Sequence, residues 1–412
     1  MIAQGFRARH SPPHAEVARS LREGGAARTL AVVGGGLAGM SVAFHATQLD
    51  SSVGVAIFDA AKPGEGGASA AAAGLLHPLT KRGGLIWRGV ESFDSAARLV
   101  QRTQAHADEA HAPGPPQPFC FEHGVLRVAR SEAQAKMYED SAAKARWRCA
   151  DSPHAAEHFS WVDGQQARAL IGEAAAPSDC AGGVWCARGL CIDAPSYLRA
   201  LWAATAEAAA SARWCVVEVR ALAELCAQFD AVVVAVGAAS ANVPGLEKQP
   251  LSLVRGQTLC YRMPVEACPR VGVLGGVYLV PLEDAPGGRR VIGGATYEPL
   301  GMGAEAEVEV DADAPSAALA DLRVQLGLLW PPSEGAQLKG GRLHGSGIRA
   351  VPPRTHRVPL TGRVPGTENA WFVTGLGGRG LLYHAELGRT VAAAALTNDN
   401  GALLSETTAK RT

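Results

Sequence analysis

Short apolar runs and helical patterns alternate in the first part of the chain. Residues 30–33 form an apolar run, a small-residue helix follows the glycines at 34–39, and residues 53–58 form a second apolar run. Buried parallel strands have this continuous apolar character, and a helix between two such strands is typical of a βαβ unit. The pattern therefore predicts an α/β domain that begins with a strand, a helix and a parallel strand.

The pattern changes twice in the later part of the chain. Residues 190–243 again alternate strand and helix, whereas residues 251–300 hold short apolar segments separated by turns, which is typical of an antiparallel sheet. Helices are predicted at 85–111, 132–147, 163–171, 311–330 and 381–396, and strands at 214–222, 229–240, 251–254, 258–262, 276–280, 290–293 and 371–374. This order indicates a nucleotide-binding domain assembled from separated segments, with a second domain made of the insertions.

A glycine motif lies between the first two strands. Gly34, Gly36 and Gly39 form a G-x-G-x-x-G, and Asp59 follows Gly39 by 20 residues. In a dinucleotide site the first glycine permits a tight turn, the second lets the backbone approach a diphosphate, and the third lets helix and strand pack closely. The diphosphate rests on the N-terminal end of the helix, and the acid binds a ribose hydroxyl. An ordinary βαβ turn without a ligand is the alternative.

Composition and charge narrow the class of protein. The 412 residues suffice for two domains, and the formal net charge of zero argues against a nucleic-acid-binding surface. No apolar run reaches the length of a membrane-spanning helix. The nine cysteines are scattered without a repeated C-x-x-C, so neither a disulfide framework nor a metal site is expected. They are expected to be small buried residues in a reducing compartment.

The N-terminal 28 residues differ from the rest of the chain. They hold five arginines and two glutamates without an apolar signal-peptide stretch, and they predict neither a strand nor a stable core helix. An organelle-targeting segment and a flexible tail are both compatible with this composition. The protein is therefore expected inside the cell, in a plastid or another organelle, with the cytoplasm as the alternative. A flexible tail is also expected at residues 399–412.

Along residues 29–398, these segments together resemble the D-amino-acid-oxidase-type (DAO) flavoprotein family. The resemblance rests on the order of several motifs. They are VVGGGLAG (32–39), GASAAAAGLLHP (67–78), LCIDAPSYLRAL (190–201), VRGQ (254–257), VYLVP (277–281), VIGGATYEP (291–299), GIRA (347–350) and TGLGGRGLLYH (374–384). Within the family the likeness is strongest to plant and cyanobacterial-type members, which are similar to the oxidase half of the tRNA methylaminomethyl-uridine enzyme.

The resemblance implies a fold of two domains. One is a Rossmann-type FAD-binding domain built from discontinuous segments, and the other is an α+β substrate domain with an antiparallel sheet. The FAD-binding domain comprises residues 29–95, 188–250 and 343–398, and the substrate domain comprises residues 96–187 and 251–342. Residues 1–28 and 399–412 lie outside both domains.

FAD is the cofactor that the resemblance implies. Its binding is expected to be non-covalent, because no flavin-linking Cys or His occupies the usual place of the family. The C-terminal glycine loop lies against the flavin in this family, where its N–H groups stabilise the anionic reduced ring. The residues implied to contact FAD are Gly34, Gly36, Leu37, Ala38, Gly39, Asp59, Ala68, Ser69, Ala73, Gly74, Leu75, Val217, Gly237, Gly377, Gly378, Arg379, Gly380 and Leu381.

Three residues are implied to act on the substrate. Arg349, in GIRA, matches the carboxylate clamp of the family, because a guanidinium binds a carboxylate bidentately, and a structural arginine is the alternative. Tyr278 matches a position whose hydroxyl faces the substrate, and a half-buried strand tyrosine is equally compatible. His77 follows the flavin-proximal segment and is either catalytic or a packed, hydrogen-bonded histidine.

One loop departs from the family pattern. Many relatives carry an acid after the GxR motif, whereas this chain has Arg354, Thr355 and His356 at that place. Positive and neutral groups in place of the acid favour a more anionic substrate.

The implied activity is oxidation of a primary or secondary amine, with an amino acid or an N-substituted glycine as the substrate class. Hydride leaves the α-carbon for flavin N5, the imine hydrolyses, and oxygen accepts the electrons to give peroxide. Two alternatives stay open. One is a tRNA-modifying oxidase of carboxymethylaminomethyl-uridine, and the other is a flavin-binding protein without turnover.

Overall fold

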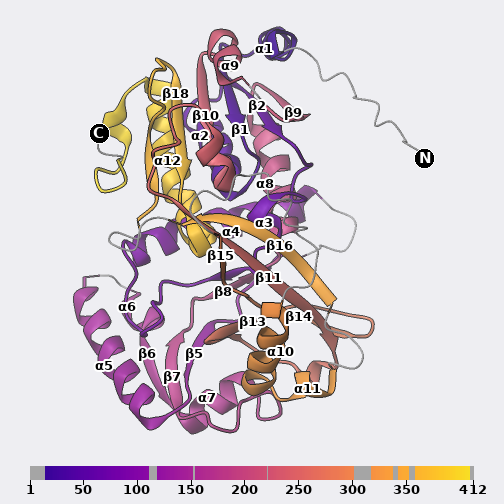
Figure 1. The fold of residues 1–412 in the computed structure, drawn as a ribbon, viewed down its shortest axis with the longest axis vertical. Helices are drawn as coiled ribbons and strands as arrows, with labels where there is room; N and C mark the ends of the chain where they lie inside the picture. Colours follow the sequence, from indigo (N-terminus) through magenta and orange to yellow (C-terminus); the bar gives the residue numbers. More distant parts are fainter. Residues whose placement is uncertain are drawn as a thin grey trace.

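Two sheets organise the molecule, and they form the upper and lower halves of Figure 1. The computed structural model describes residues 14–110, 118–151, 154–219, 221–300, 317–336, 342–351 and 358–408. For residues 335, 336 and 342–350 it describes the backbone alone. The combination of a parallel sheet, a largely antiparallel sheet and covering helices confirms the predicted α/β fold class.

The upper sheet has six strands in the order β17–β18–β10–β1–β2–β9. Its strands are β1 (Arg28–Val33), β2 (Val53–Asp59), β9 (Ser211–Val216), β10 (Ala231–Val234), β17 (Leu360–Arg363) and β18 (Ala370–Thr374). β1 pairs in parallel with both β2 and β10, as the apolar runs predict, whereas β17 pairs antiparallel with β18. Parallel pairing brings the C-terminal ends of β1, β2 and β10 to one edge, where the loops of such sheets bind ligands.

Helices cover both faces of the upper sheet. One face carries α2 (Leu37–Leu49), α4 (Gly89–Ala110), α8 (Ala194–Ala208) and α12 (Gly380–Thr397). The other face carries α1 (His14–Glu23) and α9 (Leu222–Gln228). Leu30 and Val32 of β1 belong to the first core, and Ala31 and Val33 belong to the second, because successive strand residues point to opposite faces.

Helix α1 corrects the expectation for the N-terminal segment. Its Val17, Ala18 and Leu21 are buried in the core that also contains residues of β2 and α9. The expectation of no stable core helix before residue 29 is therefore wrong for His14–Glu23. Three apolar positions give only a weak helical pattern in a charged segment, and packing on the sheet supplies the missing stabilisation. Residues 1–13, which the targeting prediction also covers, lie outside the described residues.

The C-terminal segment also packs against the upper sheet. After η4 (Asn400–Ala402), the Thr407 carbonyl accepts a hydrogen bond from the Thr361 N–H of β17 at 2.9 Å. The hydroxyls of Thr361 and Thr407 lie 2.7 Å apart, and Thr361 forms a β-bridge with Thr408. The expectation of a flexible tail is therefore wrong as far as residue 408.

The lower sheet has nine strands in the order β15–β11–β14–β13–β12–β5–β7–β6, and β16 pairs with β11. Its strands are β5 (Val125–Ala129), β6 (Ser160–Asp163), β7 (Gly182–Cys186), β11 (Ser252–Met263), β12 (Gly272–Gly275), β13 (Val277–Ala285), β14 (Gly288–Gly294), β15 (Glu298–Pro299) and β16 (Arg342–Val351). The pairs within residues 251–300 are antiparallel, as predicted, whereas β12 and β5 are parallel.

Strand β11 is continuous where the sequence predicts two strands. The polar residues Arg255 and Gln257 interrupt the apolar pattern, yet both are buried. Arg255 pairs with Glu298 of β15 on one side and with Ile348 of β16 on the other, so the ladder runs through this interruption. Hydrogen bonds from the neighbouring strands therefore satisfy the backbone N–H and C=O groups of a segment that the apolar pattern does not predict as a strand.

The two faces of the lower sheet have different neighbours. α7 (Gly164–Ile171) and α10 (Ala317–Leu329) pack on the face to which Leu126 and Val128 contribute. The opposite face packs Val125 and Ala129 with α5 (Glu132–Arg148) and with Leu79, which comes from the segment after β2. This second face is therefore the one that meets the glycine-rich segment of the upper half.

Short elements lie near the junction of the two halves and at the periphery. A small sheet combines β3 (Leu75–Leu76), β8 (Leu190–Ile192) and β4 (Cys120–Phe121). The short helices are α3 (Gly67–Ala70), α6 (Ala155–His158), α11 (Pro332–Ala336), η1 (Gly237–Asn242), η2 (Val265–Ala267) and η3 (Gly377–Arg379). None of the helices within the described ranges is both long and apolar enough to cross a membrane.

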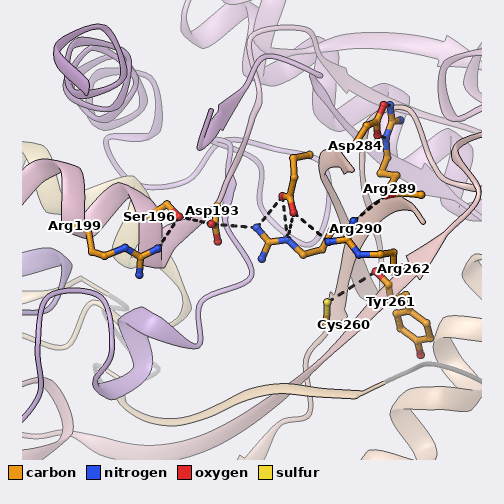
Figure 2. A network of polar contacts seen from close by, with 11 residues as sticks. Asp193, Ser196, Arg199, Cys260, Tyr261, Arg262, Asp284, Arg289 and Arg290 are labelled. Carbon is orange, nitrogen blue, oxygen red and sulfur yellow. Dashed lines mark hydrogen bonds and ion pairs between the residues drawn. The ribbon is translucent and has the colours of Figure 1, made fainter. Parts of the chain in front are cut away.

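A polar network joins the two halves (Figure 2). The carboxylate of Asp193, at the start of α8, forms an ion pair with Arg290 Nη2 of β14 at 3.1 Å. Glu283 of β13 binds Nε of the same guanidinium at 2.7 Å. Burial alone would lower the pKa of Arg290, but the hydrogen bonds with Glu283 and the charge of Asp193 raise it. The half-buried cation is therefore matched by two carboxylates.

Candidate active site

The loop between β1 and α2 requires glycine at two positions for the packing of the chain itself. Gly34 has a φ of +100°, and a Cβ there would lie 2.5 Å from the Ala235 carbonyl oxygen. A Cβ at Gly39 would lie 1.9 Å from the Gly34 carbonyl oxygen. The first glycine thus permits the turn and the third permits the close approach of α2, as the spacing of the motif predicts.

Helix α2 begins directly at this loop, without a side-chain cap from its own N-cap residue, Gly36. The Leu37 N–H instead donates to the Ser69 hydroxyl of α3 at 3.1 Å. A Cβ at Gly36 would lie 2.8 Å from the same oxygen. The start of a helix concentrates N–H groups and positive dipole, so Gly36, Leu37 and Ala38 form a place suited to a diphosphate.

Asp59 lies at the end of β2, beside the glycine loop. Its carboxylate accepts hydrogen bonds from the Gly35 N–H at 2.6 Å and from the Ala61 N–H at 2.8 Å. The Val217 N–H donates to the Asp59 carbonyl at 2.8 Å, so these two predicted cofactor residues are neighbours. This end of β2 therefore holds a charged acceptor at the edge of the loop, which is the arrangement that a ribose hydroxyl needs.

Trp214 of β9 is a residue of this region that the sequence patterns did not reveal. A Cβ at Gly35 would lie 2.2 Å from its ring, and its indole N–H donates to the Ala61 carbonyl at 3.0 Å. The ring therefore packs directly on the glycine loop. A tryptophan in an ordinary strand gives no sign of this role, because the contact depends on the pairing of β9 with β2.

The second glycine-rich segment runs from the upper sheet toward the lower one. Ala68 and Ser69 lie in α3, whose backbone packs against β16. Gly74 has a φ of +94°, and a Cβ there would lie 1.8 Å from the Ile192 carbonyl oxygen. Ala73 is buried, and Leu75 pairs with Cys191 of β8. The segment is thus fixed between the small sheet and β16.

The C-terminal glycine loop lies close to the first one. A Cβ at Gly380, the first residue of α12, would lie 3.1 Å from the Leu37 side chain. Gly377 has a φ of +56° and, like Gly237, adopts a conformation that favours glycine. A Cβ at Gly378 or Gly237 would have no other atom within 4 Å. These two positions border open space, whereas the glycines of the first loop do not.

Strand β16 connects these segments. Its backbone packs against α3, η1 and η3, and Figure 1 shows it crossing the middle of the molecule between the two halves. Arg349 is paired with Val254 near the end of this strand. The structure therefore brings the strand that carries Arg349 to the same region as α3, η1 and η3. Arg354, Thr355 and His356 lie outside the described residues.

His77 lies just beyond the second glycine-rich segment. Its Nδ1 accepts a hydrogen bond from the Leu79 N–H at 3.0 Å, so a neutral ring carries its proton on Nε2. Burial, followed by the positive charges of Arg127 and Arg379, holds the pKa of His77 well below its ordinary value. His77 is therefore a neutral hydrogen-bond donor at physiological pH.

Tyr278 of β13 lies on the lower sheet at the edge of this region. It pairs with Leu274 of β12 and with Gly294 of β14. A Cβ at Gly294 would lie 2.7 Å from the Tyr278 ring, so the ring rests on the glycine of the next strand. The side chain is half-buried, which fits both expectations for it, a substrate contact and a strand tyrosine.

The arrangement fits FAD in three respects. The start of α2 provides helix N–H groups, Asp59 provides a carboxylate at the strand end, and open space borders Gly237 and Gly378. Leu381, in the first turn of α12 after the C-terminal loop, is buried. The start of α2, the end of β2 at Asp59, and the loops at Gly237 and Gly378 thus lie along one edge of the upper sheet.

Comparison with known proteins gives the same picture. The family described as FAD dependent oxidoreductase (DAO) matches residues 29–394. Among solved structures, glycine oxidase from Geobacillus kaustophilus is similar with 23% identity and a TM-score of 0.68, covering 90% of this chain and 95% of that chain. None of the curated proteins compared with this chain matches it.

Two further solved structures share the fold. Iminodiacetate oxidase from Chelativorans sp. BNC1 is 18% identical, with a TM-score of 0.64 over 90% of this chain and 95% of that chain. L-proline dehydrogenase from P. horikoshii is 14% identical, with a TM-score of 0.66 over 91% of this chain and 94% of that chain. At these identities the likeness carries the fold alone.

Proposed function

This chain belongs to the FAD dependent oxidoreductase (DAO) family, and on that premise we propose that it oxidises a primary or secondary amine that carries a carboxylate. The substrate class is an amino acid or an N-substituted glycine. The observation that supports this most directly is that the C-terminal glycine loop lies close both to Leu37, which follows the first glycine loop, and to β16. Solved structures of similar fold are a glycine oxidase, an iminodiacetate oxidase and a proline dehydrogenase.

FAD is held non-covalently in this proposal, with its ADP half on the first loop. The N–H groups of Gly36, Ala38 and Gly39 at the start of α2 would bind the diphosphate, because the helix dipole favours negative charge there. Asp59 binds the ribose, since its carboxylate is already anchored at the loop by Gly35 and Ala61. The packing of Trp214 on Gly35 keeps the loop in this shape.

The ring half lies beside the C-terminal loop. When bound, FAD would supply the redox chemistry as the hydride acceptor, with oxygen as the final acceptor of the electrons. Gly377, Gly378, Arg379 and Gly380 contribute positive dipole and charge from the protein side. The open space at Gly378 and Gly237 allows a flat group to approach the backbone.

The substrate residues come from the lower half. Arg349 binds the substrate carboxylate bidentately, which fixes the α-carbon relative to the ring. The Tyr278 hydroxyl donates a hydrogen bond to the same carboxylate. Neutral His77 offers an Nε2–H and no positive charge, so it can orient the substrate as a hydrogen-bond donor. A neutral amine needs no strong base, and water then hydrolyses the released imine to a carbonyl compound and ammonia or a smaller amine.

The decisive experiment is a test of the purified protein with its flavin. Acid precipitation should release all yellow colour into the supernatant, because the cofactor is not covalently linked. A panel of amines and amino acids, added without oxygen, should bleach the flavin absorbance, and addition of oxygen should restore it and produce peroxide. Flavin that no member of the panel bleaches would contradict the proposed oxidation and favour a flavin-binding protein without turnover.

Substitution of Arg349 tests the carboxylate clamp. Arg349→Met should lower kcat/KM for an amino acid by about 100-fold, mainly through KM, because a charge-assisted bidentate contact is lost. Arg213→Met is the matched control, since this exposed arginine lies on β9 of the other sheet. Equal kinetics for the two variants would make Arg349 a structural arginine.

A further inference from the structure

Arg127 is a buried cation for which the described part of the chain offers no carboxylate. It lies in the middle of β5, and only 7% of the residue is exposed. Its Nε has no hydrogen-bond partner, and its electrostatic neighbours are Tyr138, which also hydrogen-bonds it, and Arg379. A guanidinium stays charged in proteins, so burial without a counter-ion destabilises the fold unless a ligand compensates.

A second arginine of the same sheet shows how such burial is usually compensated. Arg255 of β11 is 8% exposed, and its Nη1 lies 3.8 Å from a carboxylate oxygen of Glu298. The burial of the two arginines is nearly equal, yet only Arg255 faces an acid within the described residues. Burial in this sheet therefore does not by itself explain why Arg127 faces no carboxylate among the described residues.

The position of Arg127 points toward the candidate active site. Along the lower sheet it pairs with Leu274 of β12, which in turn pairs with Tyr278 of β13, so all three residues share one face. Its neighbours two positions away, Val125 and Ala129, pack in the same cluster as Leu79 and Tyr278. Arg127 thus lies on the face of the sheet that meets the segment after His77.

The charges around Arg127 make this region electropositive. Both Arg127 and Arg379 lower the pKa of His77, so two cations lie near one neutral imidazole. Arg379 also lowers the pKa of Arg127 after the larger effect of burial. Two cations with a common neutral neighbour favour an anionic ligand between or beside them.

We propose that Arg127 binds a second anionic group of the substrate, a carboxylate or phosphate remote from the amine that is oxidised. This inference rests on the proposed amine oxidation and narrows its substrate class to acidic amines. The FAD diphosphate is a poor alternative partner, because its place is the start of α2 in the upper sheet, whereas Arg127 belongs to the lower sheet. Arg127 is a specificity residue in this scheme, and Arg349 keeps the carboxylate next to the reacting carbon.

The test compares acidic and neutral amino acids on the FAD-loaded enzyme. Alanine, glutamate and phosphoserine, each in both enantiomers, form the panel. For the wild type, glutamate or phosphoserine should be the better substrate, and Arg127→Met should lower its kcat/KM by about 30-fold or more, mainly through KM. The kcat/KM of alanine should change by less than about 3-fold, since alanine has no group for Arg127. The better of the two acidic substrates tells a carboxylate partner from a phosphate partner.

Equilibrium binding provides a second readout that does not depend on turnover. Glutarate and butyrate have related carbon chains and differ in the second carboxylate, and neither can be oxidised as an amine. Arg127→Met should weaken glutarate binding, measured by calorimetry, and leave butyrate binding unchanged. Arg127→Lys should recover part of the glutarate affinity, because the charge remains while the fork geometry is lost.

Arg130→Met is the matched control. Arg130 follows β5 directly, but its guanidinium already binds Asp179 at 2.7 Å, so acidic and neutral substrates should be unaffected. Equal losses for alanine and glutamate in Arg127→Met, or a shift of the flavin reduction potential without any loss of discrimination, would overturn the inference. If the wild type oxidises no amine at all, the proposed function fails, and the glutarate arm alone decides the role of Arg127.

Discussion

Two glycine-rich loops border the candidate cofactor site, and their glycines have different surroundings. At the first loop, a Cβ on Gly34 or Gly39 would meet backbone oxygen at 2.5 Å or 1.9 Å. At the C-terminal loop, a Cβ on Gly378 would meet nothing within 4 Å, and one on Gly380 would meet the Leu37 side chain at 3.1 Å. The first loop needs its glycines for the fold, whereas the second leaves backbone open to a ligand. Similar sequence motifs thus serve two different physical purposes.

The largest effect is expected from Gly39→Ala. The new Cβ must displace either α2 or the loop, and we expect the free energy of unfolding to fall by about 3 kcal/mol, with loss of bound flavin. Urea denaturation followed by circular dichroism measures the first change, and flavin content measures the second. Alanine is intrinsically the better helix residue, so a stabilised variant would show that the close approach of α2 to the loop is not tight.

The next effect concerns pH and the histidine behind the C-terminal loop. His384 of α12 is fully buried, donates from Nδ1 to the Leu381 carbonyl and lies 2.7 Å from the Tyr197 hydroxyl through Nε2. Burial is the main cause that lowers its pKa from 6.5 to about 4. The unfolded chain therefore binds the proton more readily, so this contribution to stability is full above pH 6.5 and is lost as the pH falls toward 4.

We expect the free energy of unfolding to fall by about 2 kcal/mol between pH 7 and pH 4.5 because of His384. Urea denaturation of the wild type at both pH values measures the total change, and the same pair of curves for His384→Gln isolates this residue. The variant should show a shallower dependence on pH in this range. If the free energy of unfolding depends on pH equally in the variant and the wild type, groups other than His384 cause the loss of stability in acid.

A smaller and more local effect is expected from Asp59→Ala at the first loop. The Gly35 and Ala61 N–H groups lose their charged acceptor, and FAD loses its ribose contact. A hydrogen bond to a charged group contributes about 1.5–3 kcal/mol, so the Kd for FAD should rise by about 10- to 100-fold. The Kd is measured by titrating the flavin-free protein with FAD and monitoring the quenching of flavin fluorescence. Unchanged affinity would remove Asp59 from the cofactor site.

The smallest effect on stability is expected from Gly378→Ala, the same change as in the first experiment but at the second loop. The backbone there has a φ of −79°, which alanine adopts without strain, and the Cβ enters open space. The free energy of unfolding should therefore change by less than about 0.5 kcal/mol. FAD binding should weaken, or the flavin absorbance maximum should move, because the methyl group enters the space proposed for the ring. Normal flavin binding and spectrum would assign this space to something else.

The sequence was sufficient for the regular parts of the upper sheet. Continuous apolar runs and the G-x-G-x-x-G predicted β1, α2 and β2, and the closing helix was found almost to the residue as α12. These elements follow local periodicity, and their packing agrees with it. Helix α1 was missed because its stability comes from the sheet that it covers.

The candidate site was only partly accessible to sequence patterns. Gly34 and Gly39 could be predicted because their roles depend on local turns and helix packing. Trp214 and Arg127 could not, since each gains its meaning from a neighbouring strand. One signal for Arg127 was present: an arginine between apolar residues in VLRVA interrupts a buried strand, and such an interruption is a reason to look for a ligand.

The return of the C-terminal segment to β17 protects an edge of the upper sheet. Edge strands expose N–H and C=O groups in a row, and these groups can add a strand from another molecule and start aggregation. Residues 407 and 408 occupy that place beside Thr361 within the same chain. Removal of residues 405–408 would therefore leave the outer edge of β17 open to pairing with a strand of another molecule, which is a route to aggregation.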